Sequence, residues 1–523
     1  MPNRNIIATI VAAAVVVIAL VIGANAHFFK GQANTIATVP LGSDSADNPI
    51  VRENTQIGTS DWKIPAGQDA TTEIQAYVSA RSVAPGQNIT FYVSTQQAGT
   101  RYTLFVYRLG WYMGKGARQM MAAHGVGEAQ GYFDEANSKL VDCTTCYVDH
   151  NTGLVEARWK PSYSLTIPND WTSGVYLVKL VDANNKQTYT SFDVLGNTNS
   201  TYVVVTADTT YAAYNDWGGY SLYDYNSPHG RASHVSFLRP STQQDGSDQV
   251  LVFEADAIHW LEQQGYNLSY ISSVDLHTHP EALLKHKAYI SLGHDEYWTK
   301  EMRDGVDSAR DHGVGLAFLE ADASYWQMRF EPSTSGQPDE TLVCYKVQSD
   351  NHDLARDPLY GKDNSRVTGM WRDPVVNRPE NELIGIMFSD ITHKQKGYPW
   401  IVDPGAKSSF MSGTNLTPGE SYGCGLVGYE WDKIFNNGST PKNLQVLATS
   451  PTINDDGQKD SSNTTIYFAP SGAMVFASGS VYWAAGLDTY RYETDSHCPG
   501  QASTISGMQK LLSNVMDGLI VHH

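Results

Sequence analysis

After residue 200 the sequence alternates between short apolar runs and longer segments whose apolar residues recur at helical spacing. A continuous β-branched run is typical of a strand that is buried on both faces of a parallel sheet. Strands that alternate with helices at this period predict a doubly wound α/β sheet, with a last helix packed on it. The segments in order are "YVVVTA" (202–207), "SDQVLVFEADAIHWLEQ" (247–263), "YNLSYIS" (266–272), "HPEALLKH" (279–286), "AYISLG" (288–293), "KEMRDGVDSARDH" (300–312), "VGLAFLE" (314–320) and "STISGMQKLLSNVMDGLI" (503–520).

Three of these apolar runs are followed by segments rich in tyrosine, tryptophan and carboxylates. They are "DTTYAAYNDWGGYSLYDYN" (208–226), "HDEYW" (294–298) and "ADASYW" (321–326). Ligands of open parallel sheets bind outside the carboxyl ends of the strands, where the connecting loops converge. We therefore expect the three segments to share one pocket.

The segment "HDEYW" places three ionisable groups side by side directly after a buried strand. His294 and Glu296 are two residues apart, so an extended backbone directs both side chains to one face and turns Asp295 away. Such a pair suits a general acid and base, part of a metal site, or a structural hydrogen bond that fixes the loop. Asp322 arrives from the neighbouring strand as a third polar group, or alternatively as a helix N-cap.

Several standard chemistries lack their residues in this sequence. It contains no Gly-x-Ser-x-Gly elbow, no Walker motif and no His-Glu-x-x-His, and none of its cysteines follows a strand of the inferred sheet. Acid–base or metal chemistry remains. Tyrosines near the inferred strand ends favour metal chemistry, because phenolate is a hard anionic donor that suits a highly charged cation such as ferric iron. The count of 30 tyrosines does not decide this by itself, since aromatic packing is the default role of any one of them.

Residues 70–195 have a different pattern, in which short strands alternate with turns. The strands are "EIQAYVSA" (73–80), "NITFYVST" (88–95), "YTLFVYRL" (102–109) and the hairpin "GVYLVKLVDANNKQTYTSFDV" (174–194). This pattern predicts a β-sandwich domain at 61–197, followed by the α/β domain at 198–523. The glycines of "YRLGWYMGKGAR" (107–118) lack the Lys-Ser/Thr ending of a phosphate loop, so we expect a loop between strands there.

The N-terminal residues predict export. Residues 6–24 form an uncharged apolar stretch long enough to span a bilayer, so 1–26 is a signal peptide or a membrane anchor, and 27–60 is a linker. The expected location is extracytoplasmic, either membrane-anchored or secreted. Five cysteines fit an oxidising compartment: Cys143 and Cys146 are close enough to bridge, and the remaining three leave one odd thiol.

Composition excludes one class of partner. The chain has a formal net charge of −19, with 41% hydrophobic and only 17% charged residues. Such a chain is globular and repels polyanions, so nucleic acid is not an expected partner.

Several long motifs resemble the large (β) subunit family of N,N-dimethylformamidase. They occur in one order between about residues 100 and 490. Besides "YRLGWYMGKGAR", they are "AYNDWGGYSLY" (213–223), "VSFLRP" (235–240), "GHDEYW" (293–298), "ASYWQMRFEPS" (323–333), "WRDPVVNRPENELIG" (371–385), "LVGYEWD" (426–432) and "GSVYWAAGLD" (479–488).

This resemblance implies an immunoglobulin-like β-sandwich followed by a glutamine-amidotransferase-like α/β domain. It also implies an amidohydrolase with a mononuclear ferric iron held by two tyrosines and a glutamate. Carried over by motif, the metal ligands are Tyr176, Tyr214 and Glu296, and the catalytic residues are His294 and Asp322. The chain departs from the family at 320–322, where it reads Glu-Ala-Asp instead of the usual glycine-alanine-asparagine.

Two functions of different classes follow. The first is an exported, iron-dependent hydrolase of a carbon–nitrogen amide bond, with a small-molecule amide as substrate. The second is a non-catalytic surface protein that binds a glycan or peptide with the same aromatic pocket. In both, the membrane is a partner through the N-terminal segment, and homo-oligomerisation is left open.

Overall fold

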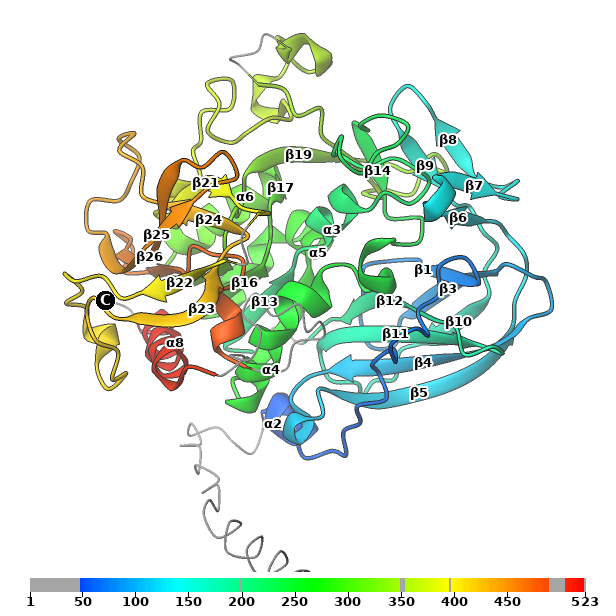
Figure 1. The fold of residues 1–523 in the computed structure, drawn as a ribbon, viewed down its shortest axis with the longest axis horizontal. Helices are drawn as coiled ribbons and strands as arrows, with labels where there is room; N and C mark the ends of the chain where they lie inside the picture. Colours follow the sequence, from blue (N-terminus) through cyan, green and yellow to red (C-terminus); the bar gives the residue numbers. More distant parts are fainter. Residues whose placement is uncertain (1–47, 197–199, 349–352, 395–396, 489–503, 522–523) are drawn as a thin grey trace, which may run out of the picture. The chain divides into compact units, whose positions relative to one another are not determined.

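The apolar runs after residue 200 form the strands of a mixed seven-stranded sheet in the described part of the chain (Figure 1). The computed structural model describes residues 48–196, 200–348, 353–394, 397–488 and 504–521. The sheet has the order β15-β13-β16-β18-β27-β26-β25; its first five strands are parallel and the last two antiparallel. The strands are β13 (Tyr202–Thr206), β15 (Leu268–Ser272), β16 (Ala288–Gly293), β18 (Gly315–Glu320), β25 (Gln445–Ile453), β26 (Lys459–Phe468) and β27 (Met474–Ala477).

Helices cover both faces of this sheet, which explains why its parallel strands are apolar at every position. Val204 and Ile290 face a core that includes the apolar sides of α4 (Ala255–Gln263) and α8 (Ser506–Leu519). Val203 and Tyr289 face the opposite core, which includes α5 (Ser273–Thr278) and α6 (Lys300–Asp311). The predicted mixed α/β class is therefore confirmed.

Residues before 196 form two antiparallel-rich sheets that share one core. The three-stranded sheet has the order β1-β3-β10 and the five-stranded sheet has the order β2-β12-β11-β4-β5. Their inward side chains, such as Phe91, Val106 and Phe192, are buried against one another. The strands are β1 (Ile74–Val78), β2 (Ser82–Val83), β3 (Asn88–Thr95), β4 (Arg101–Leu109), β5 (Ala117–Val126), β10 (Tyr163–Thr166), β11 (Gly174–Asp182) and β12 (Gln187–Val194).

The remaining strands form small sheets. One has the order β14-β20-β19-β17, and β21–β24, β22–β23, β6–β7 and β8–β9 are strand pairs. Their bounds are β6 (Tyr132–Asp134), β7 (Lys139–Val141), β8 (Tyr147–Asp149), β9 (Leu154–Glu156), β14 (His234–Ser236), β17 (Tyr297–Thr299), β19 (Trp326–Glu331), β20 (Thr341–Val343), β21 (Met387–Ile391), β22 (Tyr398–Ile401), β23 (Ser421–Val427) and β24 (Glu430–Lys433).

Short helices make up most of the connections. The short α-helices are α2 (Pro49–Glu53), α3 (Asp208–Tyr214) and α7 (Asn381–Ile384). One π-helical turn, η4 (Val250–Glu254), precedes α4. The 3₁₀ helices are η1 (Tyr112–Gly114), η2 (Glu135–Asn137), η3 (Gln243–Gly246), η5 (Pro280–Lys285), η6 (Leu354–Arg356), η7 (Asn364–Arg366), η8 (Ser409–Met411) and η9 (Trp483–Gly486).

A buried ion pair joins the two-sheet part to the α/β part within the unit Asp47–His523. Arg108 of β4 donates to Glu262 of α4 from Nη2 to Oε1 at 2.7 Å and from Nη1 to Oε2 at 3.0 Å. Both side chains are fully buried. The guanidinium also donates to the Ser173 carbonyl at 2.7 Å, so the pair ties three segments together.

The structure bears on several smaller predictions. Cys143 and Cys146 form the predicted disulfide, and Cys344 is a buried free thiol. Cys424 is disulfide-bonded as well. Within 107–118, residues 110–116 connect β4 to β5 through η1, as expected for a loop between strands.

The predicted signal peptide or anchor at 1–26, most of the predicted linker and Cys498 lie outside the described residues. The described end of the linker contains α2, whose Ile50 is buried. None of the helices described between residues 48 and 521 is long and apolar enough to cross a bilayer.

Candidate functional site

The predicted polar segments meet where the strand order of the large sheet reverses. β13 lies between β15 and β16. The connection that follows β13 leads to β15 on one side, and the connection that follows β16 leads to β18 on the other side. Open α/β sheets bind ligands at such a switch point. Helix α3 follows β13 and ends at Tyr214, and His294 directly follows β16. Gly293 has φ +72°, a left-handed conformation that a glycine adopts without strain and that turns the chain out of the strand.

His294, Glu296 and Asp322 form one buried cluster. Their ligating atoms lie within 4.8 Å of one another, and His294 Nε2 is 3.6 Å from Glu296 Oε2 and 3.8 Å from Asp322 Oδ2. Asp295 turns away, since its amide donates to Glu320 Oε2 at 2.7 Å and its carboxylate accepts from Ser291. The side chains at 294 and 296 thus share one face, as the alternation of an extended chain requires.

Sequence reasoning did not select Glu430, which lies closest to the imidazole. Its Oε2 is 2.9 Å from His294 Nε2, and it is only 5% exposed. Glu430 begins β24, which pairs with β21, and neither strand belongs to the large sheet. The only signal in the sequence was the motif "LVGYEWD" (426–432), in which no residue had been given a role.

Two further side chains complete the site. Tyr223 donates to Glu296 Oε1 at 2.7 Å and to Oε2 at 2.6 Å, and Tyr297 donates to the Tyr223 hydroxyl at 2.8 Å. The Lys346 ammonium lies 3.4 Å from the centroid of the Tyr223 ring and 4.9 Å from that of Trp326. A buried ammonium between aromatic faces adds a second positive charge that, with His294, acts on Glu296.

The structure brings Tyr214 to this cluster but not Tyr176. The Tyr214 ring lies 5.4 Å from the His294 ring and 4.2 Å from the Tyr223 ring. Tyr176 points from β11 into the core shared by the two sheets, where its ring stacks on Trp171 at 4.9 Å. Its hydroxyl donates to the Thr172 carbonyl at 2.6 Å. Its side chain points inward from the strand, so Tyr176 packs in the sheet core and makes no contact with His294 or Glu296.

Charge is unevenly distributed in the cluster. Burial opposes protonation of His294, but the adjacent carboxylates, Glu430 foremost, raise the pKa of the imidazole well above its usual range. Burial, reinforced by the Glu296 charge, raises the pKa of Asp322 well above its usual range. The raised pKa favours the protonated form, in which the carboxyl would donate a hydrogen bond as the asparagine of the family pattern does. The residue has φ +57°, a left-handed conformation that asparagine and aspartate tolerate best.

The residues of the cluster fit a bound cation. Within the described chain, His294 Nε2, Asp322 Oδ1 and Glu430 Oε2 are buried atoms without a hydrogen-bond partner. The 2.9 Å approach of Nε2 to Glu430 Oε2 is an ion-pair contact when the imidazole is protonated. Unpaired buried polar atoms are costly, and a hard cation among carboxylate and phenol oxygens would satisfy the carboxylate oxygens of this set, which leaves His294 Nε2 for a proton.

The cluster opens into a cavity of about 1100 Å³. Tyr214, Tyr223 and Glu430 line its inner end, and Tyr225 and His393 line its outer part. The arrangement therefore offers a buried acid–base pair and a charged binding site at the end of a solvent-connected cavity.

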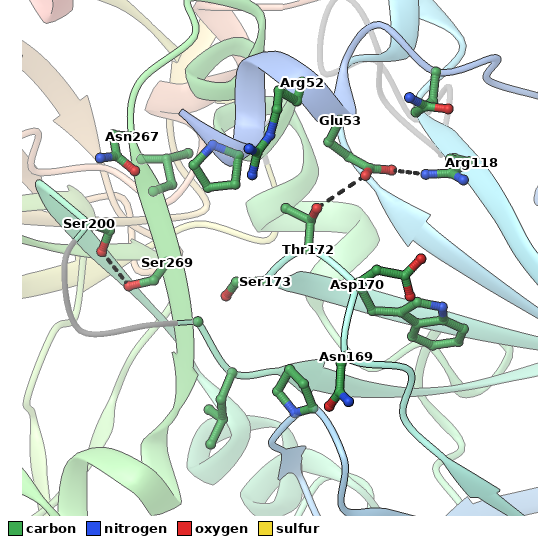
Figure 2. A pocket seen from close by; sticks show the side chains of 17 residues that line it. Arg52, Glu53, Arg118, Asn169, Asp170, Thr172, Ser173, Ser200, Asn267 and Ser269 are labelled. Carbon is green, nitrogen blue, oxygen red and sulfur yellow. Dashed lines mark hydrogen bonds and ion pairs between the residues drawn. The ribbon is translucent and has the colours of Figure 1, made fainter. Parts of the chain in front are cut away.

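A second cavity, of about 660 Å³, lies between the two-sheet part and the α/β part (Figure 2). Several of its polar side chains are paired with one another: Glu53 accepts from Arg118 at 2.8 Å and from Thr172 at 3.1 Å. Ser200 and Ser269 are 2.7 Å apart on the opposite wall. None of the predicted site residues lines this cavity.

Glu254 is a buried carboxyl group whose raised pKa leads us to expect that the free energy of unfolding depends on pH. Burial raises the pKa of Glu254 from 4.5 to about 8, and its Oε1 accepts from Tyr211 and from the Ala207 amide. Because the folded state holds this proton more tightly, Glu254 lowers the free energy of unfolding as the pH rises from about 5 to 8. Glu254→Gln keeps Oε1 and removes the charge. We expect it to gain on the order of a few kcal/mol over the wild type between pH 5 and 8.5.

Urea unfolding of both proteins at pH 5, 7 and 8.5 checks this expectation. The difference between the two proteins isolates Glu254 from the other groups that titrate in this range. Parallel pH profiles of the two proteins would contradict it.

Comparison with known proteins identifies the family of this chain. A family model described as "N,N-dimethylformamidase beta subunit-like, C-terminal" matches residues 103–498. The N,N-dimethylformamidase beta subunit of Alcaligenes sp is 23% identical over 417 residues, which cover 66% of this chain and 54% of that protein. The beta subunit from Paracoccus aminophilus is 22% identical over 421 residues with the same coverage. The chain spans about half the length of these curated relatives.

Solved structures add nothing to this relationship. An alkylpurine DNA glycosylase from Pseudomonas fluorescens matches with a TM-score of 0.14 and 13% identity, over 24% of this chain and 30% of that one. A score of this size carries no argument about the fold. The family model, in contrast, covers about three quarters of the sequence. The chain therefore belongs to the N,N-dimethylformamidase beta subunit-like family.

Proposed function

We propose that the protein is a metal-dependent hydrolase of a carbon–nitrogen amide bond. The observation that carries the proposal is the buried cluster in which His294 lies among Glu296, Asp322 and Glu430 at the inner end of a large cavity. Membership of the N,N-dimethylformamidase beta subunit-like family supports the same reaction class. An acid–base imidazole beside several carboxylates suits hydrolysis, because one group takes a proton from water while another gives one to the leaving amine.

We propose Tyr214, Tyr223 and Glu296 as the residues that hold a mononuclear ferric ion. Tyr223 takes the role that the motif comparison assigned to Tyr176, because its hydroxyl is 2.6 Å from Glu296 Oε2. Two phenolates and one carboxylate would balance the charge of a trivalent ion. When bound, such an ion supplies Lewis-acid polarisation of the amide carbonyl and of a water molecule.

The other polar residues act on protons and orientation. His294 Nε2, which faces Glu430 at 2.9 Å, holds the proton that the departing amine nitrogen needs. Protonated Asp322 donates a hydrogen bond to the substrate carbonyl or to the oxygen that develops from it. Lys346, held over the Tyr223 ring, offsets the negative charge of the Tyr223–Glu296 pair.

The finer description of the fold and the location belong to the same proposal. The family resemblance implies an immunoglobulin-like sandwich for the two-sheet part and a glutamine-amidotransferase-like domain for the α/β part. The apolar stretch at 6–24 supports an extracytoplasmic, membrane-anchored or secreted protein, and so does the Cys143–Cys146 disulfide.

Metal analysis with an absorption spectrum tests the ligand set. We expect about one iron per purified chain and a visible tyrosinate charge-transfer band, both lost on treatment with a strong chelator. Tyr223→Phe is expected to weaken or shift the band and to lower the affinity for iron at least about tenfold. Loss of a residue that only orients a ligand already costs that much, so loss of a ligand costs no less. Tyr176→Phe is the matched control and is expected to keep both, because Tyr176 lies in the sheet core.

A metal-free protein that hydrolyses no amide would exclude the hydrolase and favour the non-catalytic binding protein. Loss of the band in Tyr176→Phe but not in Tyr223→Phe would restore the ligand set expected from the motifs alone.

A further inference from the structure

The cavity in front of the cluster is much larger than a simple formamide needs. Its volume of about 1100 Å³ is slightly above the roughly 300–1,000 Å³ found for sites of drug-sized ligands. An amide of about five heavy atoms would leave most of this space to water, and such a substrate would gain little from the walls. The dimensions point to a substrate whose amide is attached to a larger group.

Two aromatic walls border the cavity. The first is built on the segment after α3, where the Tyr214 and Tyr223 rings lie 4.2 Å apart and those of Tyr223 and Tyr225 5.7 Å apart. The second joins η4 to the segments before β24 and η9, with ring distances of 5.9 Å both for Phe253–Tyr429 and for Tyr429–Tyr482. Ring faces of this kind bind the flat, apolar face of a cyclic group by dispersion. Tyr225 is 74% exposed, so its ring is accessible to a ligand in the cavity.

Neutral polar side chains lie between the two walls. Thr242, Gln243, Gln244 and Gln249 line this part of the cavity. Gln249 is only 7% exposed, yet its Oε1 has no hydrogen-bond partner among the described residues and its Nε2 makes only a 3.4 Å bond to Gln243. A buried amide oxygen without a donor is costly, and a small rotation would let a ligand hydroxyl supply that donor.

The charged groups at the outer rim already have partners. His393 Nδ1 lies 2.9 Å from Asp455 Oδ2, and the Lys394 ammonium donates to the neutral Asp455 carbonyl. The other described residues that line the outer part are aromatic, apolar or neutral polar. Aromatic faces with neutral hydrogen-bonding groups between them suit an uncharged, hydroxyl-rich ring.

We propose that the substrate is an N-acylated amino sugar, carried as a short oligosaccharide. This inference rests on the proposed hydrolase function and names its substrate class. The amide lies against His294 and Glu430 while the sugar rings extend between the Tyr225 and Tyr482 walls. A water oxygen bonds to the acyl carbon and the C–N bond breaks. One proton passes to the nitrogen, which leaves as the free amine of the sugar, and the acyl group leaves as a carboxylic acid.

A peptide amide fits these walls less well. Extended peptides bind mainly by adding a strand to an exposed sheet edge. The residues that line this cavity come mostly from helical turns and connections, namely the segment after α3, η3, η4 and the segments that flank β21 and β24. A sugar needs only ring faces and scattered hydrogen-bonding groups.

The test uses the metal-loaded full chain with three probes: the N-acetylated glucosamine trimer, N,N-dimethylformamide and an N-acetylated tripeptide. Proton NMR of released acetate or formate gives the rates. Tyr225→Ala is expected to raise KM for the trimer about tenfold, as loss of one stacking face predicts. The same variant should raise KM for the trimer more than KM for the small formamide, which does not reach the Tyr225 ring. Gln249→Leu, which keeps the volume, is expected to raise KM for the trimer as well. Tyr360→Ala, at an exposed tyrosine outside the cavity, is the matched control.

The possible results separate this inference from the proposed function. Hydrolysis of the trimer, weakened in Tyr225→Ala and not in Tyr360→Ala, supports both. If the formamide is hydrolysed but the trimer is neither hydrolysed nor a competitive inhibitor, the sugar substrate is wrong and the hydrolase function stands. Preference for the tripeptide overturns the sugar in favour of a peptide. If no amide is hydrolysed, the proposed hydrolase function is wrong, and calorimetric titration with the trimer then tests the ligand class alone. Binding that Tyr225→Ala weakens about tenfold keeps the ligand class, and absence of binding overturns it.

Discussion

Glu296→Gln is expected to remove the bound metal and to abolish amide hydrolysis. Glu296 accepts both hydrogen bonds from Tyr223 and faces His294 Nε2 at 3.6 Å, so it lies between the proposed ligands and the acid–base pair. A neutral amide lacks the charge that holds a hard cation, and its NH₂ group opposes the imidazole. We expect kcat/KM to fall on the order of 10³-fold or more, together with loss of iron and of the visible band. Metal analysis and single-substrate kinetics on one preparation measure both.

The control for this variant is Glu420→Gln, which makes the same substitution at an exposed position outside the site. It is expected to retain both metal and activity. A thermal melt of each variant separates loss of the site from loss of the fold, because Glu296→Gln preserves the size and shape of the side chain. Full metal occupancy and full activity in Glu296→Gln would show that the cluster is structural.

Much of the site was predictable from the position of its residues along the chain. His294 and Asp322 follow β16 and β18, and Tyr214 ends the helix after β13, so the rule for carboxyl ends of parallel strands locates all three. The two-residue alternation also assigned His294 and Glu296 to one face. What the pattern could not decide was which tyrosine of residues 208–226 approaches Glu296, because Tyr223 lies in an irregular segment without a periodicity.

Glu430 and Lys346 show a different limit of sequence reasoning. Glu430 lies 134 positions after Glu296 in the sequence. It reaches His294 because β24 pairs with β21 outside the large sheet. Lys346 has φ +50° and follows β20. No glycine, asparagine or proline next to it in the sequence indicates a turn at this position. Both depend on tertiary packing of short strands, for which local propensity is a weak guide.

The fold itself followed the apolar pattern closely where the pattern was long. The β-branched run at β13 and the amphipathic α6 were both predicted, because burial on two faces or on one face leaves a distinct periodicity. Short segments differed in detail. Residues 280–285 form a 3₁₀ helix, since six residues starting at Pro280 close few α-helical bonds. The predicted helix at 247–263 begins with a π-helical turn at Val250–Glu254.

Glu262→Ala is expected to be the most destabilising single substitution between the two-sheet part and the α/β part. It removes both acceptors of the Arg108 fork and leaves a fully buried guanidinium with only carbonyl partners and Tyr112. Breaking a buried ion pair in this way costs about 3–5 kcal/mol, because the remaining charge has lost its compensation. Urea unfolding at pH 7 measures the loss as a lower midpoint at an unchanged slope.

The double variant Arg108→Met/Glu262→Leu distinguishes the cost of the orphaned charge from the value of the pair. Replacing both partners with apolar side chains avoids the buried unpaired charge, so we expect it to be clearly more stable than Glu262→Ala. Glu128→Ala is the exposed control, since its ion pair with Lys160 spans 3.7 Å with 65% and 75% of the side chains exposed. Its effect is expected to be less than about 1 kcal/mol. If the double variant is as unstable as Glu262→Ala, then the loss of side-chain packing at this junction, and not the unpaired charge, accounts for the destabilisation. If Glu262→Ala unfolds at the wild-type midpoint, the ion pair does not hold the two parts together.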